Sequence, residues 1–195
     1  MATGGQRTPS GIFIAQAIGL STSFYLLGQN ATFSVSTIPA VMEAPAPLAA
    51  RQWKKVFDQG KIVGPALAVA STLATGYLAY EYSTSSRAGK LNLAATILFP
   101  SIVPYTFALM GSTNRALISK ADSLAATALS DKAAEAGVAK NETVHALLDK
   151  WATLNLGRAI ITGVGAILAL WAALDKVEIF AFRDLSLGTG ANRLG

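Results

Sequence analysis

The last long apolar segment of the chain, Trp151 to Leu174, contains a single charged residue, Arg158. On a helix with about 100° between successive residues, Arg158 shares a face about 60° wide with Trp151, Asn155 and Thr162. An arginine inside a membrane span costs about 2.5–3.5 kcal/mol on insertion scales. Two placements are compatible with this cost. The guanidinium either extends to the lipid headgroups or faces a protein interior, where it can stabilise an anion at a binding or reaction site.

The preceding apolar segment contains two prolines four residues apart, Pro100 and Pro104. Each proline removes a backbone donor and clashes with a carbonyl of the preceding turn, so a helix through both must bend. Backbone carbonyls freed at a bend inside a membrane need new partners. The hydroxyl groups of Ser101, Tyr105 and Thr106 are the expected donors.

Polar residues also flank these two segments. Thr113 and Asn114 precede Arg115 in a turn that either caps a helix or lines a polar mouth at the membrane surface. The single histidine, His145, precedes the last span and falls about 120° from Trp151 on the helical projection. This position favours a solvated or loop-packed side chain. Imidazole ordinarily titrates near neutral pH, so His145 is kept as a candidate general base.

The whole chain is too poor in charge for an ordinary soluble domain. Of its 195 residues, 52% are hydrophobic and 14% are charged, with a mean hydropathy of +0.43; soluble domains carry about 25% charged residues. This composition excludes a disordered protein, a nucleic-acid-binding arm and an ordinary cytosolic enzyme. The sequence contains no cysteine and one histidine, which excludes thiolate ligands and multi-histidine centres, so we predict no metal site.

Stretches almost free of charge mark the helices that cross the membrane, because a span needs about 20 mostly apolar residues. We predict an all-α protein: a four-helix transmembrane bundle that forms one membrane domain. The expected segments are spans near 11–34, 62–82, 91–111 and 151–174, a polar helical loop at 115–150 with an alanine-rich helix, and an interfacial tail at 175–195. The distribution of lysine and arginine favours cytosolic first and third loops, and the sequon at Asn141 would be used only in the opposite orientation.

Two motifs resemble those of the fungal anthrone oxygenases. The first is Phe99-Pro-Ser-Ile-Val-Pro-Tyr-Thr-Phe-Ala-Leu-Met-Gly-Ser-Thr-Asn114, and the second is Trp151-x-x-x-Asn155-x-x-Arg158. Upstream, Trp53 followed by Gly60 and Pro65 is similar to that family's Trp…Gly…Pro pattern. The order and spacing match over most of the chain.

The resemblance implies a small multi-span membrane enzyme that oxidises a polyketide anthrone to an anthraquinone in secondary metabolite biosynthesis. Molecular oxygen is the implied co-substrate, with no metal, flavin or other cofactor. The implied partners are a small aromatic polyketide and membrane lipid but no nucleic acid, and self-association is left open. The implied location is the endoplasmic reticulum or another endomembrane, with several membrane crossings.

The chemistry of the substrate assigns expected roles to the candidate catalytic residues. An anthrone that loses a proton from its central methylene gives a delocalised anion, which can pass an electron directly to oxygen. Arg158 is expected to stabilise this anion, and Asn155 to hydrogen-bond to the substrate. The proton acceptor is left open between His145, a water molecule held by Asn155, and the substrate's own phenolate.

Four further residues are expected to bind the substrate. Trp151 can stack on the flat rings, and Tyr105 can hydrogen-bond to a ring oxygen. Thr113 and Asn114 can line the mouth of the site or orient water.

A non-catalytic membrane protein is the alternative function. No evident general base lies on the Trp151 face, so a four-span protein that binds, carries or scaffolds lipophilic polyketide intermediates also fits the sequence. A proton-coupled exporter fits poorly, because the only Asp or Glu in the four predicted spans is Glu81, at the very end of the second span, and the span interiors offer no proton relay.

Overall fold

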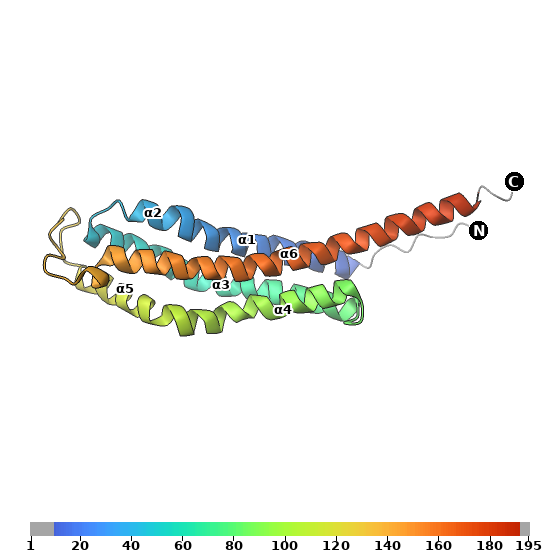
Figure 1. Ribbon diagram of the computed structural model, residues 1–195, viewed down its shortest axis with the longest axis horizontal. Helices are drawn as coiled ribbons and strands as arrows, with labels where there is room; N and C mark the ends of the chain where they lie inside the picture. The colour runs from blue at the N-terminus through green and yellow to red at the C-terminus, as the bar shows by residue number, and fades with distance from the viewer. Residues whose placement is uncertain (1–9, 192–195) are drawn as a thin grey trace.

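The computed structural model describes the backbone of residues 10–191 and the side chains of residues 10–175. In this part of the chain, long helices run antiparallel to one another (Figure 1). The elements are α1 (Ser10–Thr32), the π-helix η1 (Phe33–Thr37), α2 (Ile38–Val41), α3 (Ala46–Glu81), α4 (Arg87–Tyr105), the π-helix η2 (Thr106–Met110), α5 (Gly111–Ser123), the 3₁₀-helix η3 (Lys140–Glu142) and α6 (Val144–Ala191).

Four continuous helical stretches are long and apolar enough to cross a membrane, and they confirm the prediction of an all-α four-span bundle. They cover Ser10–Val41, Ala46–Glu81, Arg87–Ser123 and Val144–Asp175. Each is longer than the predicted span, because the helices continue past their apolar parts. The clearest case is α3, which begins next to Pro45 and Pro47, residues suited to the first turn of a helix.

The four spans form a ring in which each helix packs against two neighbours. α1 and α4 each contact α3 and α6. Polar side chains such as Ser71, Thr75 and Thr162 are buried inside the ring, whereas large apolar side chains such as Leu73 and Ile97 are exposed on its outside. This arrangement, polar within and apolar without, is that of a protein whose surroundings are lipid.

Hydroxyl groups connect the spans inside the bundle. The Oγ1 of Thr22 on α1 lies 2.8 Å from Oγ of Ser71 on α3. Thr96 on α4 donates a hydrogen bond to Oγ1 of Thr75 on α3, at 2.9 Å. Such contacts contribute to helix association in membranes, where apolar burial gives no net driving force.

The proline pair lies inside α4, which passes directly into the π-helix η2. The ribbon changes direction here, as the sequence predicted (Figure 1). Two of the expected hydroxyl donors satisfy backbone carbonyls nearby: Ser101 bonds to the Leu98 carbonyl and Thr106 to the Ile102 carbonyl, each at 2.7 Å. In the widened turn, the Met110 side chain faces the inside of the bundle and is fully buried.

The polar loop before α6 is helical only at its two ends, so the expected alanine-rich helix is not formed. α5 ends at Ser123, and residues 124–139 form a series of turns. A short isolated helix is marginal in water even when rich in alanine, and Gly137 adopts a positive φ of 83°. The Glu135 carboxylate instead accepts the backbone N–H of Val144, at 2.9 Å, and pairs with Lys120.

The last helix is continuous from the loop to Ala191 and extends beyond the end of the bundle (Figure 1). The backbone of most of the predicted interfacial tail is therefore helical. Its side chains after Asp175 lie outside the described ones, so their placement at a membrane interface stays a prediction.

Candidate active site

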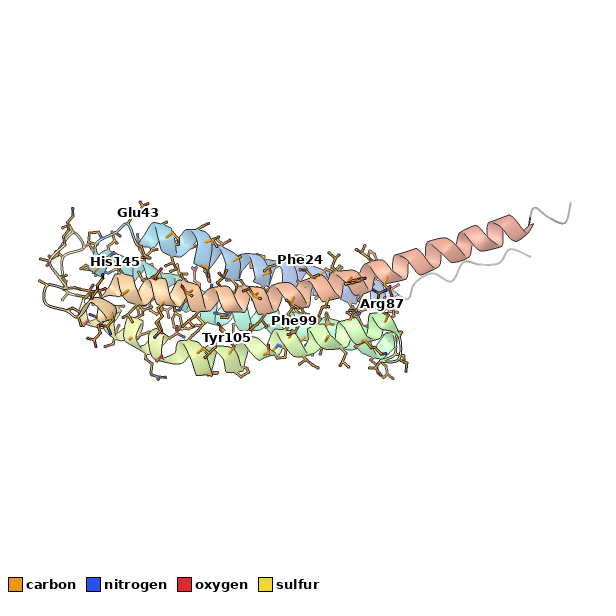
Figure 2. The ribbon with its side chains drawn as sticks, in the orientation of Figure 1. Phe24, Glu43, Arg87, Phe99, Tyr105 and His145 are labelled. Atoms are coloured by element: carbon orange, nitrogen blue, oxygen red, sulfur yellow. The ribbon has the colours of Figure 1, made fainter. Side chains whose placement is uncertain are left out.

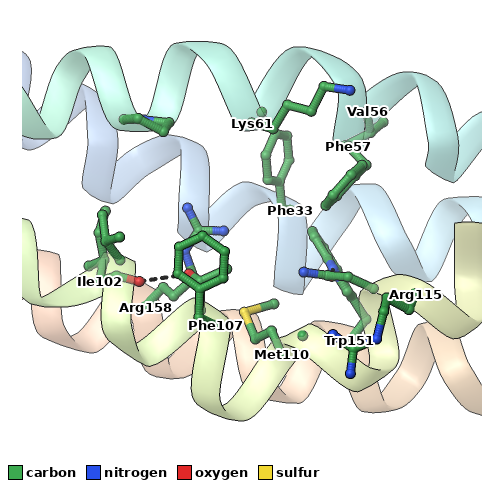
Figure 3. A pocket seen from close by; sticks show the side chains of 16 residues that line it. Phe33, Val56, Phe57, Lys61, Ile102, Phe107, Met110, Arg115, Trp151 and Arg158 are labelled. Atoms are coloured by element: carbon green, nitrogen blue, oxygen red, sulfur yellow. Dashed lines mark hydrogen bonds between the residues drawn. The ribbon is translucent and has the colours of Figure 1, made fainter.

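A cavity of about 350 Å³ lies among all four spans, at the level of the two π-helices (Figure 3). This volume falls within the range of about 300–1,000 Å³ that is usual for small-molecule sites. In Figure 2, Tyr105 lies near the middle of the bundle and His145 lies at one end of it. Both π-helices contribute to its wall, η1 through Phe33 and η2 through Thr106, Phe107 and Met110.

Aromatic and aliphatic groups form most of the cavity wall, and three cations interrupt it. The cations are Lys61 from α3, Arg115 from α5 and Arg158 from α6. None of the lining residues is an aspartate, a glutamate or a histidine. The wall is therefore suited to a flat, apolar ligand that carries or develops negative charge.

Arg158 lines the cavity, so the structure favours the inward placement over an extension to the headgroups. Its Nη1 donates to Oδ1 of Asn155 over a long 3.4 Å, and its buried Nε has no hydrogen-bond partner among the described residues. No carboxylate of the described part pairs with it. Gly64 makes room for the group, because a Cβ there would lie 3.4 Å from Nη2. A guanidinium in this state has donors left for an anionic ligand.

Asn155 is fully buried behind Arg158 and does not line the cavity. Its Nδ2 donates to the backbone carbonyl of Asn30, at 2.7 Å, and to Oγ of Ser34, at 2.9 Å. Both amide hydrogens thus tie α6 to the first span, one to α1 and one to η1, which fixes the amide oxygen toward Arg158. The arrangement makes Asn155 a group that positions the guanidinium.

Trp151 forms one end of the cavity wall. Its Nε1 donates to Oδ1 of Asn114 at 2.9 Å, so the two predicted residues are brought together and both line the cavity. The indole also packs edge-on against Trp53, with 6.2 Å between ring centroids, and beside Phe33, at 6.3 Å. Contacts on several sides hold the ring in one orientation.

Tyr105 and Thr113 lie beside the cavity without lining it. The Tyr105 hydroxyl donates to the backbone carbonyl of Leu154 at 2.9 Å and passes directly over Gly157, where an added methyl group would overlap it. Thr113 is 2% exposed, and its buried hydroxyl has no partner among the described residues. A direct role of either residue in substrate binding stays a prediction.

His145 lies at the end of the bundle, away from the cavity wall. Its Nε2 is 3.0 Å from the backbone carbonyl of Ala44, in the turn between α2 and α3. The imidazole therefore links the first turn of α6 to that connection. The structure does not bring it together with Arg158.

Several wall residues were not singled out from the sequence, among them Phe33, Phe57 and Lys61. Two residues of the Trp…Gly…Pro pattern, Gly60 and Pro65, also lie in the wall. A Cβ at Gly60 would come within 3.2 Å of the Phe33 ring. That pattern was the signal for this side of the cavity, because it marked the part of α3 that faces the ligand space.

Fold and cavity together define a multi-pass membrane protein with an aromatic pocket that carries uncompensated positive charge. The family model for anthrone oxygenases matches residues 53–168 of the chain. The chain belongs to the anthrone oxygenase family. No solved structure matches it.

The relatives are proteins of filamentous fungi. An anthrone oxygenase of Paecilomyces divaricatus is 33% identical, over 79% of this chain and 92% of its own length. An anthrone oxygenase of Aspergillus fumigatus is 29% identical, over 82% and 92% of the two chains. A noranthrone monooxygenase of Aspergillus flavus is 27% identical, over 83% and 74%.

Proposed function

We propose that this protein oxidises a polyketide anthrone to the corresponding anthraquinone with molecular oxygen. One anthrone and one O₂ give one anthraquinone and one water. The central methylene loses both hydrogens and gains a carbonyl oxygen, and the second oxygen atom leaves as water. The names of the relatives support this reaction. In this chain, the main support is the Arg158 guanidinium, which faces an aromatic cavity and has no carboxylate partner among the described residues.

The guanidinium has its effect on the first step. Loss of a methylene proton moves negative charge onto the anthrone oxygen, so a fixed cation beside that oxygen stabilises the anion more than the neutral substrate. Asn155, held by its bonds to α1 and η1, keeps the guanidinium in place. The mainly apolar wall limits the water around the guanidinium, which strengthens the electrostatic attraction.

The proton acceptor belongs to the substrate or to water in this proposal. The wall contains no aspartate, glutamate or histidine, and the amide hydrogens of Asn155 are already used. Of the three acceptors considered from the sequence, water and the substrate's own phenolate then remain. Water entering beside exposed Arg115 can carry the proton away.

We also propose that oxygen reacts with the bound anion directly, without a metal or organic cofactor. The deprotonated anthrone is itself the reductant: it transfers one electron to O₂, and the two radicals combine at the central carbon. Protonation, loss of the remaining hydrogen on that carbon and cleavage of the O–O bond give the quinone and water. The lipophilic substrate reaches the site from the bilayer of an endomembrane such as the endoplasmic reticulum.

The test is an oxygen-uptake assay on the full-length protein in vesicles, with emodin anthrone as the probe. We expect one O₂ consumed per anthraquinone formed, at a rate far above that in protein-free vesicles and unchanged by a metal chelator. Uptake that equals the spontaneous rate contradicts the oxygenase function. Uptake that a chelator abolishes contradicts only its independence from metals.

Binding without catalysis is the second candidate function, favoured by the lack of a side-chain base in the wall. A carrier of polyketide intermediates would bind the oxygen-inert anthraquinone and quench its own tryptophan fluorescence. It would leave the rate of anthrone oxidation at the spontaneous value. The same preparation therefore distinguishes the two functions.

A further inference from the structure

The cavity has a second cationic end, formed by Arg115 on α5. Figure 3 shows Arg115 near Trp151, with Arg158 at the opposite end of the wall. We propose that Arg115 binds a carboxylate on the outer ring of the substrate, so that the preferred substrate is an anthrone carboxylic acid. This inference rests on the proposed oxygenase function and narrows its substrate class.

The spacing of the two guanidinium groups suits a tricyclic ligand. Trp151 and Arg158 are seven residues apart on α6, which corresponds to about 10 Å along the helix. Asn114 is hydrogen-bonded to Trp151 and so places its neighbour Arg115 at the Trp151 level. An anthrone lying along the wall would bring its reacting oxygen to one guanidinium and an outer-ring substituent to the other.

The three cations of the wall differ in the partners they already have. Lys61 is paired with Asp58 at 2.6 Å, so its charge is compensated within the protein. Arg115 makes no ion pair or hydrogen bond with any described residue, and its side chain is exposed at the mouth of the cavity. A planar guanidinium with unused donors matches a carboxylate through two parallel hydrogen bonds.

The experiment compares two substrates that differ in one group. Emodin anthrone and its ring-carboxylated counterpart are oxidised by the full-length protein in vesicles of phosphatidylcholine only. We expect Arg115→Gln to lower kcat/KM for the carboxylated anthrone about tenfold more than for emodin anthrone, mostly through KM, because a charged hydrogen-bond pair is lost. Arg115→Lys should restore only part of the preference, and high salt should reduce it, since the pair is exposed.

Two controls exclude other sources of the effect. Lys150→Gln removes one exposed positive charge next to the same end of α6, outside the cavity wall, and should leave the substrate ratio unchanged. Binding of the two oxidised products, the anthraquinone and its carboxylic acid, is followed by tryptophan quenching and should give the same ratio without turnover.

The possible results are distinct. If Arg115→Gln affects both substrates equally, or if Lys150→Gln changes the ratio as much, the inference is wrong. If adding anionic lipid alone removes the preference for the carboxylated substrate, Arg115 binds lipid headgroups and the inference is also wrong. If the unmodified protein oxidises neither anthrone, the proposed function itself fails.

Discussion

Toward the turn between α3 and α4, the four spans pack closely through hydroxyl pairs, whereas toward α5 they separate around the cavity. We call these regions the packed half and the pocket half. In the packed half, Thr22 pairs with Ser71 and Thr96 with Thr75. In the pocket half the helices contain π-helical turns, and aromatic rings replace the small side chains.

The two halves also differ in how completely buried polar atoms are satisfied. Five buried side-chain atoms of the described residues have no hydrogen-bond partner. Four of them belong to the pocket half, in Asn30, Trp53, Thr113 and Arg158, and only the Asn92 oxygen lies in the packed half. An unsatisfied buried group reduces stability, and of these four residues only Arg158 lines the cavity, where a ligand can bind its guanidinium.

The largest expected effect comes from removing the buried cation of the pocket half. Arg158→Gln keeps a polar side chain of similar length but removes the charge that stabilises the substrate anion, so kcat should fall at least about 100-fold. Oxygen uptake with emodin anthrone measures the loss. Thr75→Val, in the packed half, is the matched control and should retain turnover. Equal losses in both variants would mean that the two halves do not differ in function.

A smaller effect is expected for the residue that positions this cation. Asn155→Ala removes the hydrogen bonds to α1 and η1 and the contact to Arg158. The guanidinium then samples more orientations, and we expect kcat to fall about tenfold with little change in KM. A purely structural role would instead lower the amount of folded protein and leave kcat per folded molecule intact, which size-exclusion chromatography and active-site titration with the quinone distinguish.

The close contact between α4 and α6 gives a third, weaker test. In Gly157→Ala the new methyl group overlaps the Tyr105 hydroxyl and breaks its bond to the Leu154 carbonyl. The strain should lower stability by about 1–3 kcal/mol and turnover a few-fold, because the wall shifts beside η2. Adding Tyr105→Phe removes the overlapping oxygen and should recover part of the melting temperature. No recovery would place the strain elsewhere.

The fold was largely predictable because a bilayer sets the length of each span. Gaps between charges therefore identified the four spans, and Pro100 and Pro104 identified the bend. The π-helix η1 was not predicted, because the first span is uncharged on all sides and has no periodic polar face whose rotation would reveal an extra residue. The local sequence feature that accompanies η1 is Pro39, which has no backbone N–H to donate a hydrogen bond to the preceding turn. The alanine-rich loop was predicted as helix, and there Glu135 and the turns it stabilises overrode intrinsic propensity.

The candidate site was predictable only where its residues share one helix. The 3.6-residue period placed Trp151, Asn155 and Arg158 on one face, and that face is buried or lines the cavity. Spacing within one helix carries no information about which residues of another helix lie opposite. Phe33 was missed for this reason, although it lies in a predicted span, and Lys61 lies one residue before the predicted second span, in a part of α3 that was expected to be loop.

The smallest effect should come from the packed half itself. Thr96→Val preserves shape but removes the hydrogen bond to Thr75. Interhelical hydrogen bonds in membranes average about 0.6 kcal/mol, so unfolding in detergent should occur only slightly earlier, and a double-mutant cycle with Thr75→Val should recover that coupling energy. Turnover per folded molecule should stay that of the unmodified protein, since neither residue lines the cavity. A marked loss of turnover with so small a change in stability would show that the packed half controls the geometry around Arg158, and the division between the halves would then be wrong.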